Sequence, residues 1–211
     1  MTVTAGHARF FLIEALRNYS ANFVLENDRS PQEFRLNGRR YAAHVSLVHD
    51  SGEGRDNDDE MRIQVSQGVR AQLSSAHRSG VTVAFVGFPA DASVFVAWEP
   101  EYVLNSAAQQ RSLYAKASDV SEATDFTACL RRTRSTTLGR TVAAVYLRSE
   151  FLGFYLENIE AFHRLTDTSE LQSLIGVATA AGAESDHSGL SSFEGSVTGG
   201  RQKFVSTRIA Y

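Results

Sequence analysis

The sequence predicts an α+β fold built on a mainly antiparallel curled sheet or β-barrel with a few helices. Three observations predict it. Short β-type stretches fill most of residues 34–147, residues 61–66 alternate strictly between apolar and polar side chains, and the clearest helical periodicity comes late, in residues 149–165. Strands that come first and a helix that closes the domain are typical of α+β folds. At 211 residues and 43 % hydrophobic composition, the chain can bury a core without disulfides.

The first half of the chain contains one clear turn signal and two strand signals. Residues 8–17 are apolar without alternation, which fits a short helix or a buried strand. The pair Asn37-Gly38 is typical of a tight hairpin turn, and a strand is expected over residues 41–48. In residues 61–66 a strand would place Arg62, Gln64 and Ser66 on the face opposite Met61, Ile63 and Val65. Residues 68–79 fit a short helix or an irregular link.

The second half begins with the two most apolar stretches of the chain. Residues 81–87 and 93–98 are joined by a turn and are predicted to form a hairpin at the centre of the sheet. Short strands are expected over 113–117 and 141–147, and a helix over 149–165 with its apolar side formed by Phe151, Leu152, Tyr155, Ile159 and Phe162.

The composition changes after Leu165. Residues 166–203 are rich in Ser, Thr, Gly and Ala, which predicts a linker with a short helix near residues 170–175. We therefore expect a recognition domain over residues 1–165 and a linker over residues 166–211.

Cysteine content and hydropathy limit where the protein is expected to act. The single cysteine, Cys129, excludes an internal disulfide framework and suits a reducing compartment. No run of 18 apolar residues and no leader of secretory type is present, so we expect a cytoplasmic protein without a membrane partner.

Charge is spread unevenly along a chain whose net charge is −3. Residues 50–60 hold six acids and one base. Bases gather before this segment and late in the domain, at Arg35, Arg39, Arg40, Arg131, Arg132, Arg134 and Arg140. Such segregation makes either a basic face or a set of solvated loops, and the sequence leaves both open.

Known catalytic motifs are missing from the sequence. It has no Gly-rich phosphate loop, no Cys-x-x-Cys pair and no His-Glu-x-x-His motif, so we expect no cofactor, no metal and no catalysis in this chain. Cys129 fits a buried residue or a Cys–His dyad. Asp58, Asp59 and Glu60 fit a solvated loop or a cation site.

What remains is a candidate binding surface. Arg62, Gln64 and Ser66 carry hydrogen-bonding groups of the kind that read base edges or phosphates. The candidate DNA contacts are Arg39, Arg40, Tyr41, Arg62, Gln64 and Ser66, with Arg111 and Lys116 on phosphates and Trp98 or Tyr114 stacked on a flipped base. Trp98 has an alternative interpretation, as the end of a core strand.

Three stretches together resemble the amino-terminal recognition domains of bacterial restriction enzymes, particularly those that precede an HNH nuclease. They are residues 61–66 (MRIQVS), 86–100 (VGFPADASVFVAWEP) and 142–158 (VAAVYLRSEFLGFYLEN), and residues 201–211 (RQKFVSTRIAY) resemble the lead-in to the nuclease. The resemblance implies a curled barrel similar to the PUA-like and pseudobarrel readers, and duplex DNA binding with sequence or base-modification specificity in a restriction system for phage defence. It also implies that a divalent metal and a homodimer contact belong to a nuclease domain missing from this chain. No Tyr-Pro pair is present, which is evidence against phosphorothioate recognition.

Two other functions fit the sequence. One is a small-molecule or protein-binding domain that regulates a fused partner, and the other is an enzyme with a dispersed site. Binding that weakens steeply as salt rises would separate DNA recognition from the former, because phosphate contacts release counterions. Metal-dependent cleavage by the purified chain would identify the latter.

Overall fold

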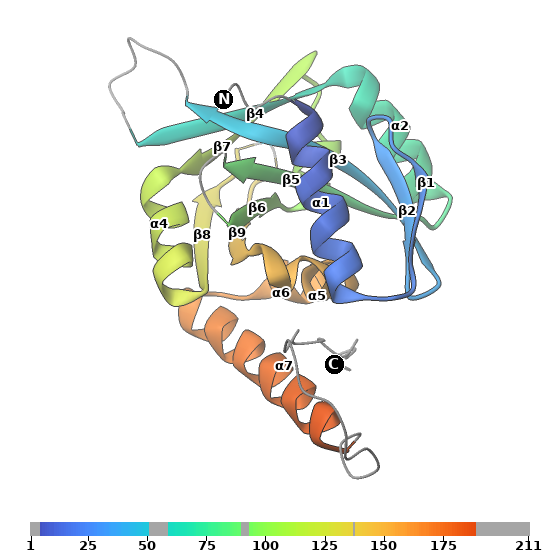
Figure 1. Ribbon diagram of the computed structural model, residues 1–211. Coiled ribbons are helices and arrows are strands. Elements are labelled where there is room, and N and C mark those ends of the chain that lie inside the picture. Colours follow the sequence, from blue (N-terminus) through green and yellow to red (C-terminus); the bar gives the residue numbers. More distant parts are fainter. Residues whose placement is uncertain (1–4, 51–58, 90–92, 137, 189–211) are drawn as a thin grey trace.

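The fold has nine strands and helices of varied length in the part of the chain that the structure describes (Figure 1). The structure is a computed structural model that describes residues 5–50, 59–89, 93–136 and 138–188. In chain order the elements are α1 (Ala5–Tyr19), β1 (Phe23–Asn27), β2 (Gln32–Leu36), β3 (Arg39–Asp50), β4 (Glu60–Ser66), α2 (Gln67–Arg78), β5 (Thr82–Pro89), β6 (Val94–Trp98), α3 (Pro100–Leu104), β7 (Gln110–Lys116), α4 (Ala117–Phe126), β8 (Ala128–Arg134), β9 (Thr141–Arg148), a 3-10 turn (Ser149–Phe151), α5 (Leu152–Glu157), α6 (Ile159–Arg164) and α7 (Thr168–Ser188).

Seven strands form the main sheet, in the order β1-β2-β3-β5-β6-β9-β8. Every neighbouring pair in it is antiparallel except β3 and β5, which run parallel and are connected through β4 and α2. The hairpin between β2 and β3 turns at Asn37 (φ 50°) and Gly38 (φ 80°), the left-handed conformations that a tight turn of this kind requires. The predicted α+β fold with a mainly antiparallel sheet is confirmed, and β5, from the predicted central hairpin, is the middle strand.

The two remaining strands, β4 and β7, form a ribbon that folds over the main sheet. They pair antiparallel over seven residue pairs, and β4 also pairs with the end of β3. On its β7 side the ribbon contacts β6, where the indole N–H of Trp98 donates to the Tyr114 carbonyl at 3.0 Å. The Lys116 N–H donates to the Tyr146 hydroxyl on β9 at 3.2 Å. Side chains rather than a strand ladder join the ribbon to β6 and β9, so the sheet is curled but not closed into a barrel.

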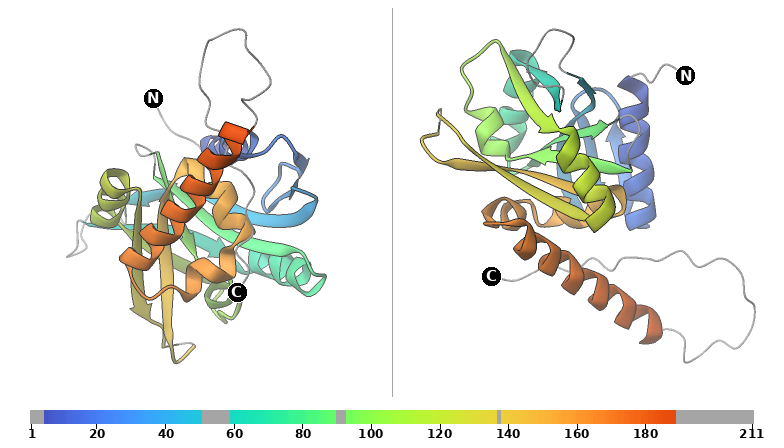
Figure 2. Two further views of the ribbon diagram at one scale, coloured as in Figure 1. Left: turned by 90° about the horizontal axis from the view of Figure 1, so that it is seen from below. Right: turned by 90° about the vertical axis from the view of Figure 1, so that its left-hand side faces the viewer.

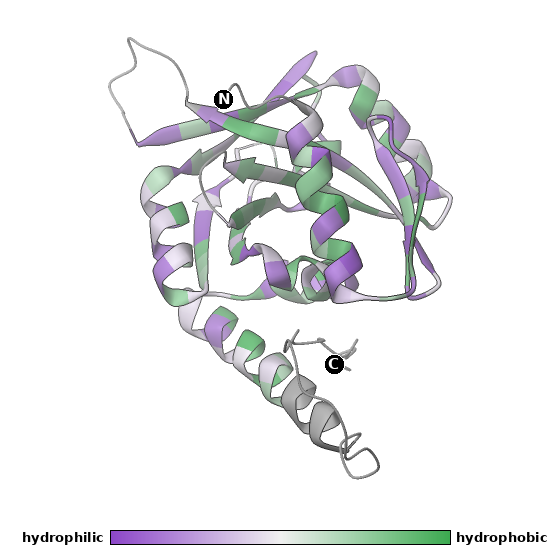
Figure 3. Cartoon of the chain, viewed as in Figure 1, coloured by the Kyte–Doolittle hydropathy of each residue, from purple (hydrophilic) through white to green (hydrophobic). Residues whose placement is uncertain are grey.

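Each face of the main sheet has its own hydrophobic core. One core lies under α1, α5, α6 and α7, and the other lies between the sheet and the β4–β7 ribbon with α2, α3 and α4 (Figure 2). Strand β6 shows the division, because Phe95 and Ala97 enter the first core while Val96 and Trp98 enter the second. Strands covered on both faces need apolar residues throughout, and all five residues of β6 are buried. In Figure 3 the centre of the sheet is accordingly mostly green, and β4 alternates.

Helix α1 approaches α5 closely at Gly153. A Cβ built on Gly153 would lie 2.1 Å from ring atoms of Tyr19, and Tyr19 is itself 4 % exposed. The Tyr19 hydroxyl donates to Glu157 at 2.7 Å, which holds the ring in place. The first core therefore depends on the absence of a side chain at residue 153.

We expect Gly153→Ala to lower the free energy of unfolding by about 2–3 kcal/mol, because overpacking a filled core forces the backbone and ring apart. Urea unfolding measures it. Gly176 is the matched control, since a Cβ there meets nothing within 4 Å, and Gly176→Ala should leave stability unchanged or raise it through helix propensity. An equal effect of both substitutions would contradict the close contact at Tyr19.

Several local predictions need correction. Much of the predicted linker is helix α7, in which Leu171, Ile175 and Ala178 are buried against the first core. These side chains recur with helical spacing among small residues, and this periodicity prevails over the linker-like composition. The predicted helix over 149–165 is divided at Asn158 (φ −127°) into α5 and α6. Strands β1 and β8 and helices α3 and α4 were not predicted. Within the described residues, no helix is both long and apolar enough to cross a membrane.

Candidate nucleic-acid interface

The outward face of the β4–β7 ribbon brings together five of the predicted site residues. Alternation along β4 buries Met61, Ile63 and Val65 in the second core. Residues directly opposite each other in an antiparallel pair point to the same side. The outward pairs are therefore Glu60 with Lys116, Arg62 with Tyr114, Gln64 with Ser112, and Ser66 with Gln110. We call this set, together with His49, the ribbon face.

His49 extends the ribbon face onto a third strand. It is exposed near the end of β3 and pairs with Arg62, which in turn pairs with Tyr114. A cationic side chain is thus flanked by an imidazole and a phenol in one row across three strands. Tyr114 is 45 % exposed, one of the few large aromatic side chains that the described part of the fold leaves open to solvent.

Lys116 lies at one end of the ribbon face beside the partly exposed carboxylate of Asp59. Its ammonium nitrogen is 3.8 Å from Asp59, which also accepts hydrogen bonds from the Ser118 N–H at 2.7 Å and from the Ser118 hydroxyl at 2.8 Å. These hydrogen bonds, first the backbone one and then the side-chain one, lower the pKa of Asp59. Asp59 therefore stays ionised and neutralises part of the charge of Lys116. Asp58, its neighbour in the predicted acidic loop, lies outside the described residues.

Ser66 lies at the opposite end of the ribbon face, as the residue that precedes helix α2. Its hydroxyl accepts from the Val69 N–H at 3.3 Å, the usual role of a serine at a helix N-cap. The side chain is exposed, so this cap remains reachable from the ribbon face.

A buried histidine supports the ribbon from the main sheet. The ring of His44 on β3 lies 3.3 Å from the Ser30 hydroxyl and 3.2 Å from that of Ser46. Burial lowers the pKa of His44 to about 4, and a hydrogen bond to the backbone of Gln64 opposes that shift in part. The ring is therefore neutral at physiological pH, and it links β3 to β4 at the position that carries Gln64.

Two predicted contact residues are buried in the cores. Tyr41 is 1 % exposed and its ring stacks on Phe34, with centroids 5.4 Å apart. Trp98 is 3 % exposed, so its alternative interpretation as a core residue is the one that the structure supports. Both strands are covered on each face, so a side chain on either side of them enters a core. Tyr41 enters the first core and Trp98 enters the second.

Arg111 points away from the ribbon face. It pairs with Val65, whose side chain enters the second core, and its guanidinium lies 4.1 Å from the ring centroid of Tyr102 on α3. A neighbouring arginine, Arg70, is buried and donates to the carbonyls of Val65 and Ala108. Arg111 thus packs the end of the ribbon against α3.

Arg39 and Arg40 lie at the other end of β3. Arg40 and His49 are nine positions apart on β3, roughly 30 Å along an extended strand. Arg40 is exposed and lies 3.7 Å from Glu26, and the Arg39 guanidinium lies 5.9 Å from the Tyr41 ring centroid. The structure therefore does not bring these arginines together with Arg62.

Sequence reasoning did not place four members of the ribbon face there: His49, Gln110 and Ser112, and Glu60, which it named only in the acidic loop. A signal was present in residues 110–116, where polar or amphipathic side chains at even positions alternate with Leu113 and Ala115. The predicted strand began only at Leu113, so half of this alternation was left out.

Comparison with known families identifies the family of this chain. The family model described as methylase-associated X1 (MTaX1) matches residues 39–156, more than half of the chain. The chain belongs to the methylase-associated X1 family. The match begins at the first residue of β3 and ends within α5, so it contains both ribbon strands. No curated protein and no solved structure matches the chain.

Membership agrees with the predicted link to restriction enzymes at a coarse level. Methylase-associated X1 domains are found in restriction-modification-related proteins, which ties this chain to methylase and restriction systems. The HNH nuclease, DNA binding and phage defence remain predictions, and residues 201–211, which carry the nuclease resemblance, lie outside the described residues.

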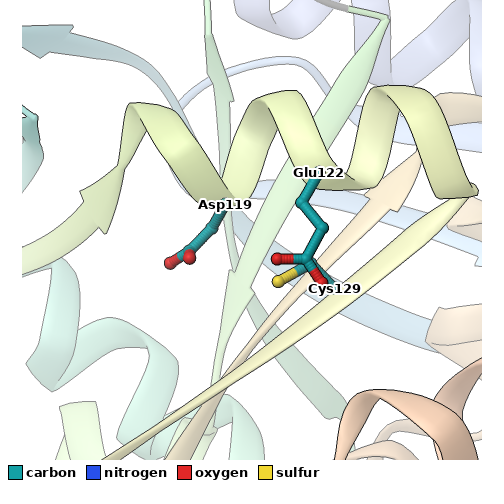
Figure 4. A group of neighbouring side chains, drawn as sticks. All are labelled: Asp119, Glu122 and Cys129. Atoms are coloured by element: carbon teal, nitrogen blue, oxygen red, sulfur yellow. The ribbon is translucent and has the colours of Figure 1, made fainter.

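One cluster of this methylase-associated X1 domain has the donors of a metal site. Ligand atoms of Asp119, Glu122 and Cys129 lie within 4.8 Å of one another between α4 and β8 (Figure 4). However, both carboxylate oxygens of Asp119 accept hydrogen bonds from Arg131. Burial, followed by the charges of Asp119 and Glu122, raises the pKa of Cys129 to about 12. The thiol therefore stays protonated in this environment, which makes it a poor nucleophile.

A groove of about 1200 Å³ lies at the end of the main sheet where β5 and β9 begin. The charged side chains that line it are mostly engaged with each other. Arg140 bonds both Glu99 and Glu101, and Glu157 accepts from Tyr19 and Asn37 at 2.7 Å each. These contacts tie α3 to the β8–β9 hairpin, and α5 to α1 and the β2–β3 turn, so they serve the fold of the methylase-associated X1 domain.

Proposed function

We propose that this methylase-associated X1 domain binds duplex DNA through the ribbon face and acts as a specificity module of a restriction-modification system. The observation that carries the proposal is the gathering of Arg62, Gln64, Tyr114 and Lys116 on one outward face. Family membership supports the setting, because substrates of methylase and restriction systems are DNA.

The composition of the ribbon face supports recognition rather than bulk electrostatic attachment. Its charged groups are few: Arg62 and Lys116 stand against Glu60 and the nearby Asp59. Hydrogen-bonding side chains, Gln64, Ser66, Gln110 and Ser112, make up most of the rest. Base edges are read by such side chains, whereas phosphate contacts alone carry no sequence information.

The rest of the predicted assembly extends this proposal. The resemblance to domains that precede an HNH nuclease supports a division of labour in which this module selects the site and a nuclease domain cuts it. Tyr114 is the aromatic residue of the ribbon face that would stack on a base displaced from the duplex.

We expect Arg62→Ala to weaken DNA binding by about 1–3 kcal/mol, roughly 5- to 150-fold in Kd, if the guanidinium contacts a base. Stability should change by about 0.5 kcal/mol or less, because Arg62 is a surface side chain outside the core. Fluorescence anisotropy over a salt series measures affinity, and thermal unfolding measures stability.

Arg17→Ala is the matched control. Arg17 is 63 % exposed on α1, which covers the opposite face of the main sheet, and within the described part of the chain its ion pair is with Glu14 on its own helix. Its removal changes the net charge equally but should leave Kd within about two-fold. Equal weakening by both variants would mean that overall charge, and not the ribbon face, attracts DNA. If the wild-type chain binds no duplex at low salt, the proposed function is wrong.

A further inference from the structure

The width of the ribbon restricts which nucleic-acid groove it fits. Neighbouring strands lie about 4.8 Å apart, so two strands with their side chains measure roughly 10 Å across. The major groove of B-DNA, about 12 Å wide, admits such a ribbon, whereas the minor groove, about 6 Å wide, does not. The major groove of A-form RNA is too narrow for side chains to read. Among duplex surfaces, shape favours the B-form major groove.

The side chains of the ribbon face match the chemistry of that groove. The Arg62 guanidinium can donate two parallel hydrogen bonds to O6 and N7 of guanine. The Gln64 amide can bond N6 and N7 of adenine in the same manner, and it is exposed two residues from Arg62 on the same face. Two residues along a strand correspond to roughly 6.6 Å, about two base-pair steps, so both side chains can reach bases of one short site.

Binding to single strands is less well supported by the same face. Proteins that bind single strands stack successive bases on several aromatic side chains. The rings of the ribbon face are the phenol of Tyr114 and the imidazole of His49, and Trp98 and Tyr41 are buried beneath other elements. A surface with one phenol, one imidazole and a row of amide, hydroxyl and guanidinium groups is better suited to base edges than to base faces.

We infer, on the basis of the proposed function, that the ribbon face lies in the major groove of B-form DNA with Arg62 and Gln64 against base edges. The C5 position of pyrimidines and the N6 group of adenine both open into this groove. Methyl groups at these positions therefore lie where the two side chains make contact. The module senses such marks on paired bases.

Groove-selective base analogues test this inference on the full chain. A short duplex is first selected from a randomised library by the wild-type protein. Each guanine and adenine is then replaced in turn by its 7-deaza analogue, which removes only the N7 acceptor. We expect at least one replacement to weaken wild-type binding about ten-fold, the effect of losing half of a bidentate contact. Methyl green, a major-groove ligand, should compete with the protein, and netropsin, a minor-groove ligand, should not.

Variants assign the contacts in a double-mutant cycle. Arg62→Ala should bind weakly and lose its sensitivity to one 7-deazaguanine. Gln64→Ala should lose its sensitivity to one 7-deaza-adenine and to N6-methylation of that adenine. Arg17→Ala should keep the full wild-type pattern.

Three outcomes overturn the inference while leaving DNA binding intact. One is wild-type binding that no 7-deaza replacement weakens, another is displacement by netropsin and not by methyl green, and the third is tighter binding to single strands than to the duplex. Failure to select any duplex would instead remove the proposed function, and the inference with it.

Discussion

Replacing Trp98 with alanine is expected to lower the free energy of unfolding by about 4 kcal/mol, within the usual range for removing a large aromatic side chain from a core. The Trp98 ring fills the space between the main sheet and the ribbon. The ring fits tightly against β5: a Cβ atom added to Gly87 would lie 2.9 Å from the Trp98 ring and 2.5 Å from the Val48 side chain. The loss is a large fraction of the 5–15 kcal/mol that stabilises a typical domain. Urea unfolding with an unchanged m-value measures it.

Trp98→Phe separates packing from the hydrogen bond. The phenyl ring keeps most of the apolar contact but cannot donate to the Tyr114 carbonyl, which Trp98 reaches at 3.0 Å. A buried carbonyl left without a partner costs about 1–3 kcal/mol, so this variant should retain a measurable fold. Its DNA affinity, measured below its melting temperature, should remain within about three-fold of wild type. Unchanged stability together with lost DNA binding would show instead that Trp98 stacks on a base.

Much of the fold could be predicted because local pattern and final structure agree there. The alternation in residues 61–66 predicted both β4 and its outward side chains, Arg62, Gln64 and Ser66. The apolar stretches that became β5 and β6 pair as the predicted hairpin, and Asn37-Gly38 forms the predicted turn. In each case short-range periodicity or turn chemistry decides the outcome, and both are visible in a single sequence.

What could not be predicted depends on pairing between distant segments. That β7 lies beside β4, and so places Tyr114 next to Arg62, is a contact across about fifty residues that no local pattern encodes. The same pairing turned Arg111 inward, because opposition to Val65 fixes its direction. Tyr41 was assigned to the surface for its chemistry, and Trp98 was left between the surface and a core strand. Each faces a core that exists only because helices and the ribbon cover both sides of the sheet.

The ion pair between Arg131 and Asp119 carries the other large expected effect. Asp119 lies in the first turn of α4, directly after β7, and its side chain is 5 % exposed, whereas that of Arg131 on β8 is 39 % exposed. The two members therefore differ in what happens when the partner is removed. Arg131→Ala leaves a carboxylate buried without its guanidinium, and we expect it to cost about 3–4 kcal/mol of stability. Asp119→Ala leaves a guanidinium that can turn toward water, so we expect a smaller loss of about 1–2 kcal/mol.

The difference in stability loss between the two variants distinguishes a desolvated charge pair from simple packing, and it can be measured. Urea unfolding of Arg131→Ala, Asp119→Ala and the double variant completes a cycle, in which the double variant should be more stable than Arg131→Ala alone, since it removes the stranded carboxylate. The matched control is Arg134→Ala. Arg134 is an exposed arginine three residues along the same strand, and its removal should change stability by no more than about 0.5 kcal/mol.

Additive losses in the cycle, or equal losses from the two single variants, would contradict this account. Because α4 follows β7 without a break, loosening this pair should also lower the DNA affinity that depends on Tyr114 and Lys116, while a protein with Arg134→Ala binds as wild type does.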